Sequence, residues 1–256
     1  MAVVTFTTDF GATDGYAGAM KGVVLSLAPD AVLVDITHEV PRHDIGAGAL
    51  ALVQAAPFFP PGTVHVAVVD PGVGGERADL VVEAGGRTFV GPDNGILSWA
   101  ARPPRQAFRI DNPRFRRAPP SPTFHGRDVF AVAAGRLAGG DAAEDAGPAF
   151  AAMFELPALD DGPLTTESQG TVVHVDGFGN LLTSLSGGVA EGRWSFDCAG
   201  QSFPLSGGRT FADVMPGTLV LYQGSSGRLE IALRDGSAAD LTGARAGTHF
   251  ALRRLP

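Results

Sequence analysis

The sequence predicts an α/β domain followed by a small all-β domain. In the first half, short apolar, β-branched runs alternate with segments whose apolar residues recur at helical spacing. In the second half, short strand-like runs are separated by glycine turns and show little helical pattern. Residues 140–168, between the two halves, are rich in Ala, Asp, Gly and Pro and indicate a linker. We therefore expect an α/β catalytic domain over 1–160 and a β domain over 168–256.

The first domain should be built on a mostly parallel sheet with flanking helices. Buried strands are expected over residues 2–8, 31–36 and 63–69. A helix capped by Thr13 or Asp14 should follow the first strand, and a helix starting at Asp44 should follow the second. Strand–helix–strand order produces parallel strands joined by right-handed crossovers.

The remaining elements complete both domains. Residues 80–83 and 87–90 predict a hairpin, and a further helix should run from about Arg127 to Leu137. In the second domain, strand-like runs occur at 171–175, 194–196, 218–222, 229–233 and 249–252. Their glycine-rich spacing indicates a small antiparallel barrel or sandwich.

Composition excludes several classes of function. The formal net charge is −8, from 19 basic and 27 acidic residues, and Lys21 is the one lysine, which argues against nucleic acid as a partner. The single cysteine, Cys198, excludes an intrachain disulfide and a Cys-rich zinc site. No apolar stretch approaches the ~18 residues of a membrane span, and the N-terminus does not resemble a secretory signal. We expect a cytoplasmic protein without a membrane partner.

Three polar residues should meet at one edge of the predicted sheet. Asp9 follows the first strand, Asp70 follows the third, and His125 lies where a helix starts. Ligands of parallel α/β sheets bind outside the carboxyl ends of the strands. Each residue alone fits an ordinary turn, cap or packing role. Their convergence predicts an enzyme that acts on a small molecule.

Other catalytic motifs are absent or incomplete. His38 and His43 suggest a zinc helix, but their spacing is one residue too long and Pro41 interrupts it. The glycine-rich PGVGGER lacks the Gly-Lys-Ser/Thr of a phosphate-binding loop. No GxSxG elbow occurs, so a serine nucleophile has no signature here.

Seven short motifs occur in order along the chain: TTDFG, Thr37-His38-Glu39, DPGVG with a downstream arginine, GPDNG, TFHGRD, DGFGN and GSSGRLEIA. Together they resemble the S-adenosylmethionine hydroxide adenosyltransferase family, which is related to the fluorinase and chlorinase enzymes. The resemblance runs from residue 7 to about residue 233. It implies an N-terminal α/β domain, a C-terminal β-barrel and a homotrimer. Each active site would lie between the first domain of one subunit and the second domain of its neighbour.

The resemblance also implies a set of substrate-binding residues. Asp9 would accept the two ribose hydroxyls, and Asp14 is a candidate partner for the methionine ammonium group. The neighbouring subunit would supply Asp176, Phe178 and Asn180. Further contacts are implied for Ser225 and Glu230. Without the resemblance, DGFGN is interpreted as a glycine-rich hairpin turn.

Three further residues distinguish the branches of this family. The resemblance assigns catalysis in the hydrolases to an Asp, an Arg and a His, which stand here as Asp70, Arg77 and His125; Asp70 would also contact the substrate. It therefore implies hydrolysis of S-adenosylmethionine to adenosine and methionine without a metal or other cofactor. The alternatives are a halide-using relative, a non-catalytic adenosyl-binding sensor, and a metal-dependent hydrolase built on Asp9, Asp14, Asp70 and His125.

Overall fold

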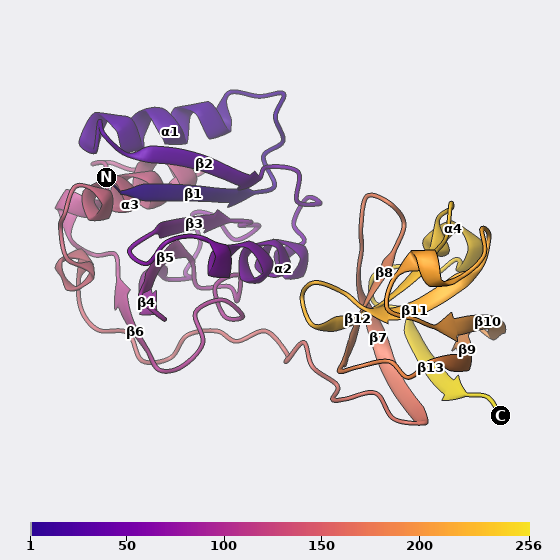
Figure 1. Ribbon diagram of the computed structural model, residues 1–256. Coiled ribbons are helices and arrows are strands. Elements are labelled where there is room, and N and C mark those ends of the chain that lie inside the picture. The colour runs from indigo at the N-terminus through magenta and orange to yellow at the C-terminus, as the bar shows by residue number, and fades with distance from the viewer. Residues whose placement is uncertain (1) are drawn as a thin grey trace. The chain divides into compact units, whose positions relative to one another are not determined.

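The computed structural model describes residues 2–256 (Figure 1). The chain divides into two compact units, one ending at Leu156 and the other starting at Pro157. Among the described residues, no helix has both the length and the apolar character needed to cross a membrane.

The first unit contains a six-stranded mixed sheet in the order β2-β1-β3-β5-β4-β6. The strands are β1 (Val3–Thr8), β2 (Val32–Thr37), β3 (Val64–Val68), β4 (Asp79–Ala84), β5 (Arg87–Pro92) and β6 (Arg105–Arg109). The first four in this order run parallel, and β4 pairs antiparallel with both β5 and β6. The chain passes from β1 to β2 on one side and then to β3 on the other. Such a reversal creates a crevice at the carboxyl ends of the central strands.

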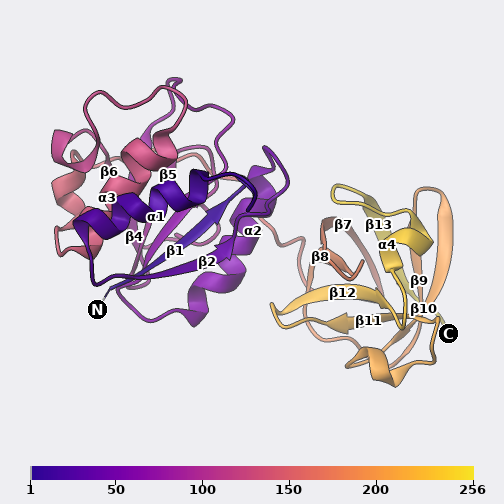
Figure 2. The same cartoon turned by 90° about the horizontal axis from the view of Figure 1, so that it is seen from above.

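Helices cover both faces of this sheet (Figures 1 and 2). The main ones are α1 (Tyr16–Leu27), α2 (Ile45–Ala55) and α3 (Ala131–Ala138), with short helices at Ala56–Phe58, Pro113–Phe115 and Ala143–Ala146. Helices α1 and α3 share one apolar core with the sheet, and α2 belongs to a second core on the other face. The sheet is thus buried on both sides, as its nearly continuous apolar strands predict.

The helix predicted to start near Arg127 has an unusual first turn. Residues Gly126–Phe130 form a π-helix, with His125 at its N-cap, and continue directly into α3. A π-helical turn inside a longer helix is frequently found at functional sites. The turn positions His125 at the edge of the sheet.

Several local predictions are confirmed, and others are wrong. Asp44 caps α2 by accepting the Ala47 N–H at 2.9 Å, and β4 and β5 form the predicted hairpin.

Helix α1 instead follows Gly15, with no side-chain cap, so the prediction of Thr13 or Asp14 as its cap is wrong. Strand β2 is only half-buried because it lies at the sheet edge. Part of the predicted linker is also misassigned, because the helix Ala143–Ala146 packs into the first core.

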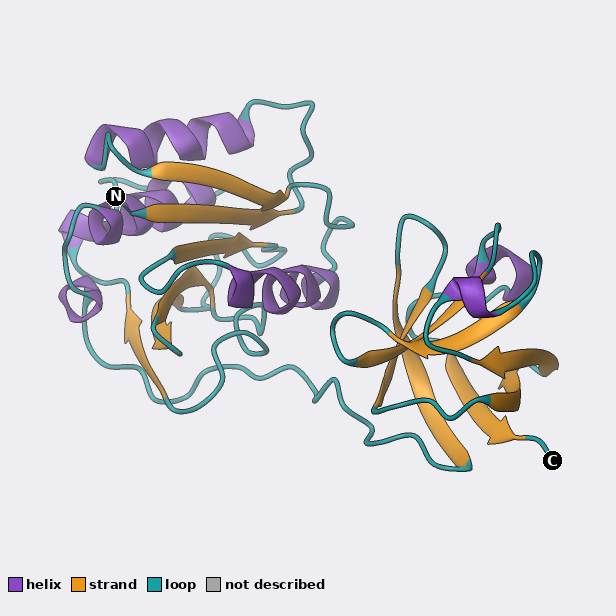
Figure 3. Ribbon diagram, in the orientation of Figure 1, coloured by secondary structure: helices purple, strands orange, loops and turns teal. Residues whose placement is uncertain are grey.

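The second unit is a closed barrel of seven strands, which decides between the predicted barrel and sandwich (Figure 3). The strands are β7 (Glu167–Val175), β8 (Leu181–Ser186), β9 (Gly192–Cys198), β10 (Gln201–Gly207), β11 (Leu219–Gln223), β12 (Arg228–Leu233) and β13 (His249–Arg254). Short helices lie at Phe211–Asp213 and at α4 (Ala238–Thr242). The barrel is not wholly antiparallel, because β10 and β11 run parallel. The sequence patterns also missed β8 and β10.

Candidate active site

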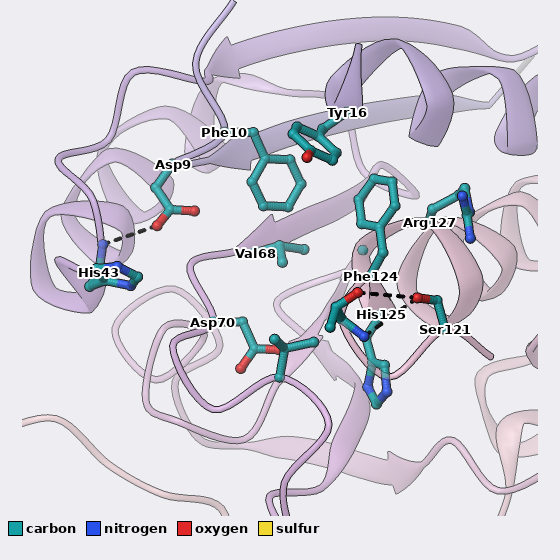
Figure 4. Close-up of a pocket in the computed structure, with 13 residues that line it drawn as sticks. Asp9, Phe10, Tyr16, His43, Val68, Asp70, Ser121, Phe124, His125 and Arg127 are labelled. Atoms are coloured by element: carbon teal, nitrogen blue, oxygen red, sulfur yellow. Dashed lines mark hydrogen bonds between the residues drawn. The ribbon is translucent and has the colours of Figure 1, made fainter. Parts of the chain in front are cut away.

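A cavity of about 480 Å³ opens in the first unit at the carboxyl ends of β1 and β3 (Figure 4). Its lining comes from the end of β3, the segments after β1, β2 and β3, the start of α1, and the segment that leads into the π-helix together with that helix's first residues. The lining residues are Asp9, Phe10, Tyr16, His43, Val68, Asp70, Val73, Ser121, Thr123, Phe124, His125, Gly126 and Arg127. The topology therefore brings Asp9, Asp70 and His125 to one cavity, as their positions in the sequence predict.

The loop that carries Asp9 is held in place by the segment after β2. Asp9 accepts the backbone N–H of His43 at 3.0 Å. The next residues donate to this segment as well: Gly11 N–H to the His38 carbonyl at 2.7 Å, and Ala12 N–H to Glu39 Oε1 at 2.9 Å. The second Asp9 oxygen has no partner among residues 2–256, so it is available to a ligand hydroxyl.

Three aromatic rings form one wall of the cavity. Phe10, Tyr16 and Phe124 contact one another edge to face, with ring centroids 5.2–6.0 Å apart. None of these three residues was predicted from the sequence as part of the site, although Phe10 and Phe124 directly adjoin Asp9 and His125 in the chain. Aromatic faces provide apolar surface and attract cations. The wall therefore suits a ligand that is partly apolar and positively charged.

Arg77 joins the side chains of Asp70 and His125 beside this cavity. Its Nε lies 3.0 and 3.1 Å from the two Asp70 oxygens, and its Nη2 lies 3.1 Å from His125 Nδ1. Only 5% of the Asp70 side chain and 11% of the Arg77 and His125 side chains are exposed. The three residues predicted as catalytic thus form one buried, hydrogen-bonded group.

A fourth member of this group is Asp79, which was not predicted from the sequence. It lies at the start of β4 and accepts from Arg77 Nη1 at 2.5 Å and from Arg116 Nη2 at 3.1 Å. Burial lowers the pKa of Arg77, but hydrogen bonds and charge from Asp70 and Asp79 outweigh it, so the pKa is raised overall. The guanidinium is therefore a fixed positive charge.

The glycine-rich loop between Asp70 and Arg77 packs closely on the segment before His125. Gly74 has a φ of +77°, and a Cβ added to it would lie 2.3 Å from the Pro122 carbonyl oxygen. Only glycine accommodates both this backbone conformation and this close contact. The loop sequence thus fixes the position of Asp70 and Arg77 relative to His125.

The DGFGN motif forms the turn between β7 and β8 in the second unit. Asp176 Oδ1 accepts the N–H groups of Phe178 and Asn180 at 2.9 Å, and its Oδ2 accepts from Asn180 Nδ2 at 2.9 Å. Asp176 therefore stabilises the turn. Phe178, which is 82% exposed, and Asn180 line a second cavity of about 590 Å³.

Besides Asp176, three predicted binding residues lie outside both cavities. Asp14 is exposed in the loop before α1, and Ser225 is exposed in the turn between β11 and β12. Glu230 is half-buried and accepts from the Tyr222 hydroxyl at 2.6 Å. Burial, with this hydrogen bond and the Glu230 charge, raises the pKa of Tyr222. The substrate roles of all three stay predictions.

No group of three or more His, Cys, Asp or Glu side chains within residues 2–256 is arranged to hold a metal ion. The two histidines considered for zinc have other surroundings. His38 Nδ1 lies 2.8 Å from Thr8 Oγ1, and its Nε2 lies 3.0 Å from Asp35. His43 lies at the first cavity, with a φ of +65°.

Comparison with known proteins defines the class to which this fold and site belong. Residues 4–147 match the model of the SAM hydroxide adenosyltransferase N-terminal domain, and residues 170–251 match that of the C-terminal domain. The chain belongs to the SAM hydroxide adenosyltransferase family, which confirms the resemblance seen in the motifs.

Individual relatives make the comparison more specific. The chain is 43% identical to an (R)-S-adenosyl-L-methionine hydrolase of Salinispora arenicola, over 93% of this chain and 92% of that protein. It is 41% identical to one of Thermus thermophilus, over 96% and 98%, but only 28% identical to a fluorinase of Nocardia brasiliensis, over 93% and 92%. An uncharacterized conserved protein of Thermotoga maritima has a similar structure, with a TM-score of 0.90 at 29% identity, covering 99% and 100% of the two chains.

Proposed function

We propose that this protein hydrolyses S-adenosyl-L-methionine to adenosine and L-methionine. The observation that carries the proposal is the buried group of Asp70, Arg77 and His125 beside the cavity. It provides a carboxylate, a fixed cation and an imidazole next to a space that suits a partly apolar, cationic ligand. The hydrolases among the relatives are also more similar to this chain than the fluorinase is.

The reaction is an in-line displacement at ribose C5′. A lone pair of water forms the C5′–O bond while the electron pair of the C5′–S bond moves to sulfur, which leaves as the neutral thioether of methionine. The water loses a proton to the protein. Because the sulfonium is already a good leaving group, the protein mainly needs to position the water, which supplies roughly 7–11 kcal/mol in ideal cases.

His125 and Asp70 are the groups that would hold this water and accept its proton. Both Asp70 oxygens already accept from Arg77, whereas His125 Nε2 has no hydrogen-bond partner in the described part of the chain. This favours His125 as the proton acceptor. General-base catalysis of this kind typically contributes about 10²–10⁴-fold to the rate.

Binding would use both units. Asp9 would accept the ribose hydroxyls, Asp14 the ammonium group, and the aromatic wall would contact the cationic substrate. Asp176, Phe178 and Asn180, with Ser225 and Glu230, would come from a neighbouring subunit of a homotrimer. No metal or other cofactor takes part in this mechanism. We also propose a homotrimer, which the family resemblance implies, and a cytoplasmic location.

The test is to incubate the purified protein with S-adenosylmethionine and EDTA and to follow the products by chromatography. Equimolar adenosine and methionine are expected. The (R) sulfonium epimer should react faster, because the chain is similar to (R)-S-adenosyl-L-methionine hydrolases. The variant His125→Ala should lose about 10²–10⁴-fold in kcat with a much smaller change in KM.

Other outcomes would support the alternatives. Tight binding without cleavage would favour the sensor, and loss of activity in EDTA would favour a metal-dependent hydrolase. A halide-dependent product would indicate the halogenase-like reaction. Equal loss of binding and turnover in His125→Ala would show that His125 only shapes the cavity.

A further inference from the structure

The buried Asp79 carboxylate lies beside His125, but it has no role in the reaction as proposed so far. Its Oδ1 lies 3.4 Å from Nδ1 of His125, while its Oδ2 accepts from Arg116. Asp79 itself is 7% exposed. It therefore faces Nδ1 of the imidazole and not the free Nε2, within the same buried group as Arg77.

The two neighbours of His125 Nδ1 impose opposite tautomers. Arg77 Nη2, at 3.1 Å, can only donate, so it pairs with an Nδ1 that carries no proton. The neutral ring then has its hydrogen on Nε2 and cannot accept a proton there. Asp79 can only accept while it is ionised, so it pairs with Nδ1–H and leaves the Nε2 lone pair free.

An acceptor for Nδ1–H is needed most when the His125 ring is protonated. Once His125 has taken a proton at Nε2, both ring nitrogens carry hydrogen, and Nδ1–H needs an acceptor. Asp79 Oδ1 is the one acceptor near Nδ1 within residues 2–256, because the guanidinium of Arg77 has no lone pair to offer. An unpaired buried N–H would oppose the proton transfer.

We propose that Asp79 is a positioning residue that accepts the Nδ1–H of His125 and so makes Nε2 the proton acceptor for the attacking water. This inference rests on the proposed function. The proton passes from water to Nε2 as the C5′–O bond forms and the C5′–S bond breaks, and it later returns to solvent from Nε2. Arg77 forms ion pairs with both carboxylates of this group, Asp70 and Asp79.

The direct test is ¹⁵N NMR of the histidine rings, which reports the nitrogen that carries the hydrogen in neutral His125. The unaltered protein should show Nδ1–H. The variant Asp79→Asn should show Nε2–H, because its amide group can donate to Nδ1. An Nε2–H tautomer in the unaltered protein would overturn the inference. The measurement needs no turnover, so it separates a failure of this inference from a failure of the proposed reaction.

Kinetics provide the second test, with Arg116→Gln as the matched control. Both variants lose the Asp79–Arg116 ion pair, but only Asp79→Asn removes the carboxylate that faces His125. Asp79→Asn should lower kcat about 10²-fold or more with KM within about threefold, whereas Arg116→Gln should keep kcat within about threefold. Asp79→Glu should recover part of the loss. Equal losses of kcat in Asp79→Asn and Arg116→Gln would show a structural ion pair instead. If Asp79→Asn does not fold, the tautomer of the unaltered protein decides.

Discussion

Arg77 is the residue on which the candidate site depends most. Its Nε and Nη2 bind Asp70, its Nη1 binds Asp79, and its Nη2 also reaches His125. The guanidinium lies over the Phe130 ring at 5.6 Å, which holds its plane. A planar fork with five N–H donors can make these contacts together, whereas an ammonium group acts as a single point of charge.

The variant Arg77→Lys should therefore lose activity despite keeping the charge. We expect kcat to fall at least about tenfold, because Lys cannot hold Asp70 and Asp79 in the same geometry. Steady-state kinetics would measure the loss, and thermal unfolding would check that the fold persists. Unchanged kcat would mean that only the charge at position 77 matters.

At the scale of elements, the loop from Asp70 to Arg77 couples the site to the fold. Gly74→Ala would place a methyl group against the Pro122 carbonyl and push this loop away from the segment before His125. The variant Gly62→Ala is a matched control, because the φ of Gly62, +80°, is similar and nothing lies within 4 Å of an added Cβ. Both variants place an alanine in the left-handed backbone conformation, which costs about 1–2 kcal/mol of stability. Only Gly74→Ala should also lose kcat, as steady-state kinetics will measure; equal kinetics in both would show that the contact is unimportant.

The sheet also contains a buried titratable residue, His65 on β3. Its Nδ1 lies 2.7 Å from Thr5 Oγ1, and its ring stacks on Phe89 at 5.2 Å. Burial, aided by the charge of Arg87, lowers the pKa of His65 to about 4. The unfolded chain, with a pKa near 6.5, binds this proton first, so stability is complete above that pH and falls as the pH drops toward 4.

The free energy of unfolding should consequently fall by about 2 kcal/mol between pH 7 and pH 5 through His65 alone. Urea unfolding at the two pH values measures the change. The double variant Thr5→Val/His65→Phe removes both hydrogen-bonding groups and should lose correspondingly less. An equal loss in both proteins would assign the pH dependence to other groups.

The structure also shows which elements the sequence could predict. Asp9 and Asp70 directly follow parallel strands, so their meeting at one edge follows from the topology alone. Asp79 begins a strand, and its place at the same edge follows only because β4 runs antiparallel to β5. Strand β6, RQAFR, is too polar to show an apolar strand pattern. The N-cap of α1 is Gly15, which has no side chain and so gives no capping signal in the sequence.

For the whole molecule, the proposed homotrimer predicts that two copies of the chain complete each site. The variants Asp70→Ala and Asn180→Ala should each be inactive, since one alters the first unit and the other the second. Mixed oligomers should regain part of the activity, because some sites then combine two intact contributions. Mixing with separation tags would measure this, and no recovery in verified mixed oligomers would contradict a shared site.

We propose that water attacks ribose C5′, and turnover of S-adenosylmethionine in H₂¹⁸O shows where the new oxygen comes from. Mass spectrometry of the products should find the label in the 5′-hydroxyl of adenosine and no label in methionine. Formation of 5′-methylthioadenosine, or of adenosine without the label, would rule out this attack, because the oxygen of the new C5′–O bond must come from solvent.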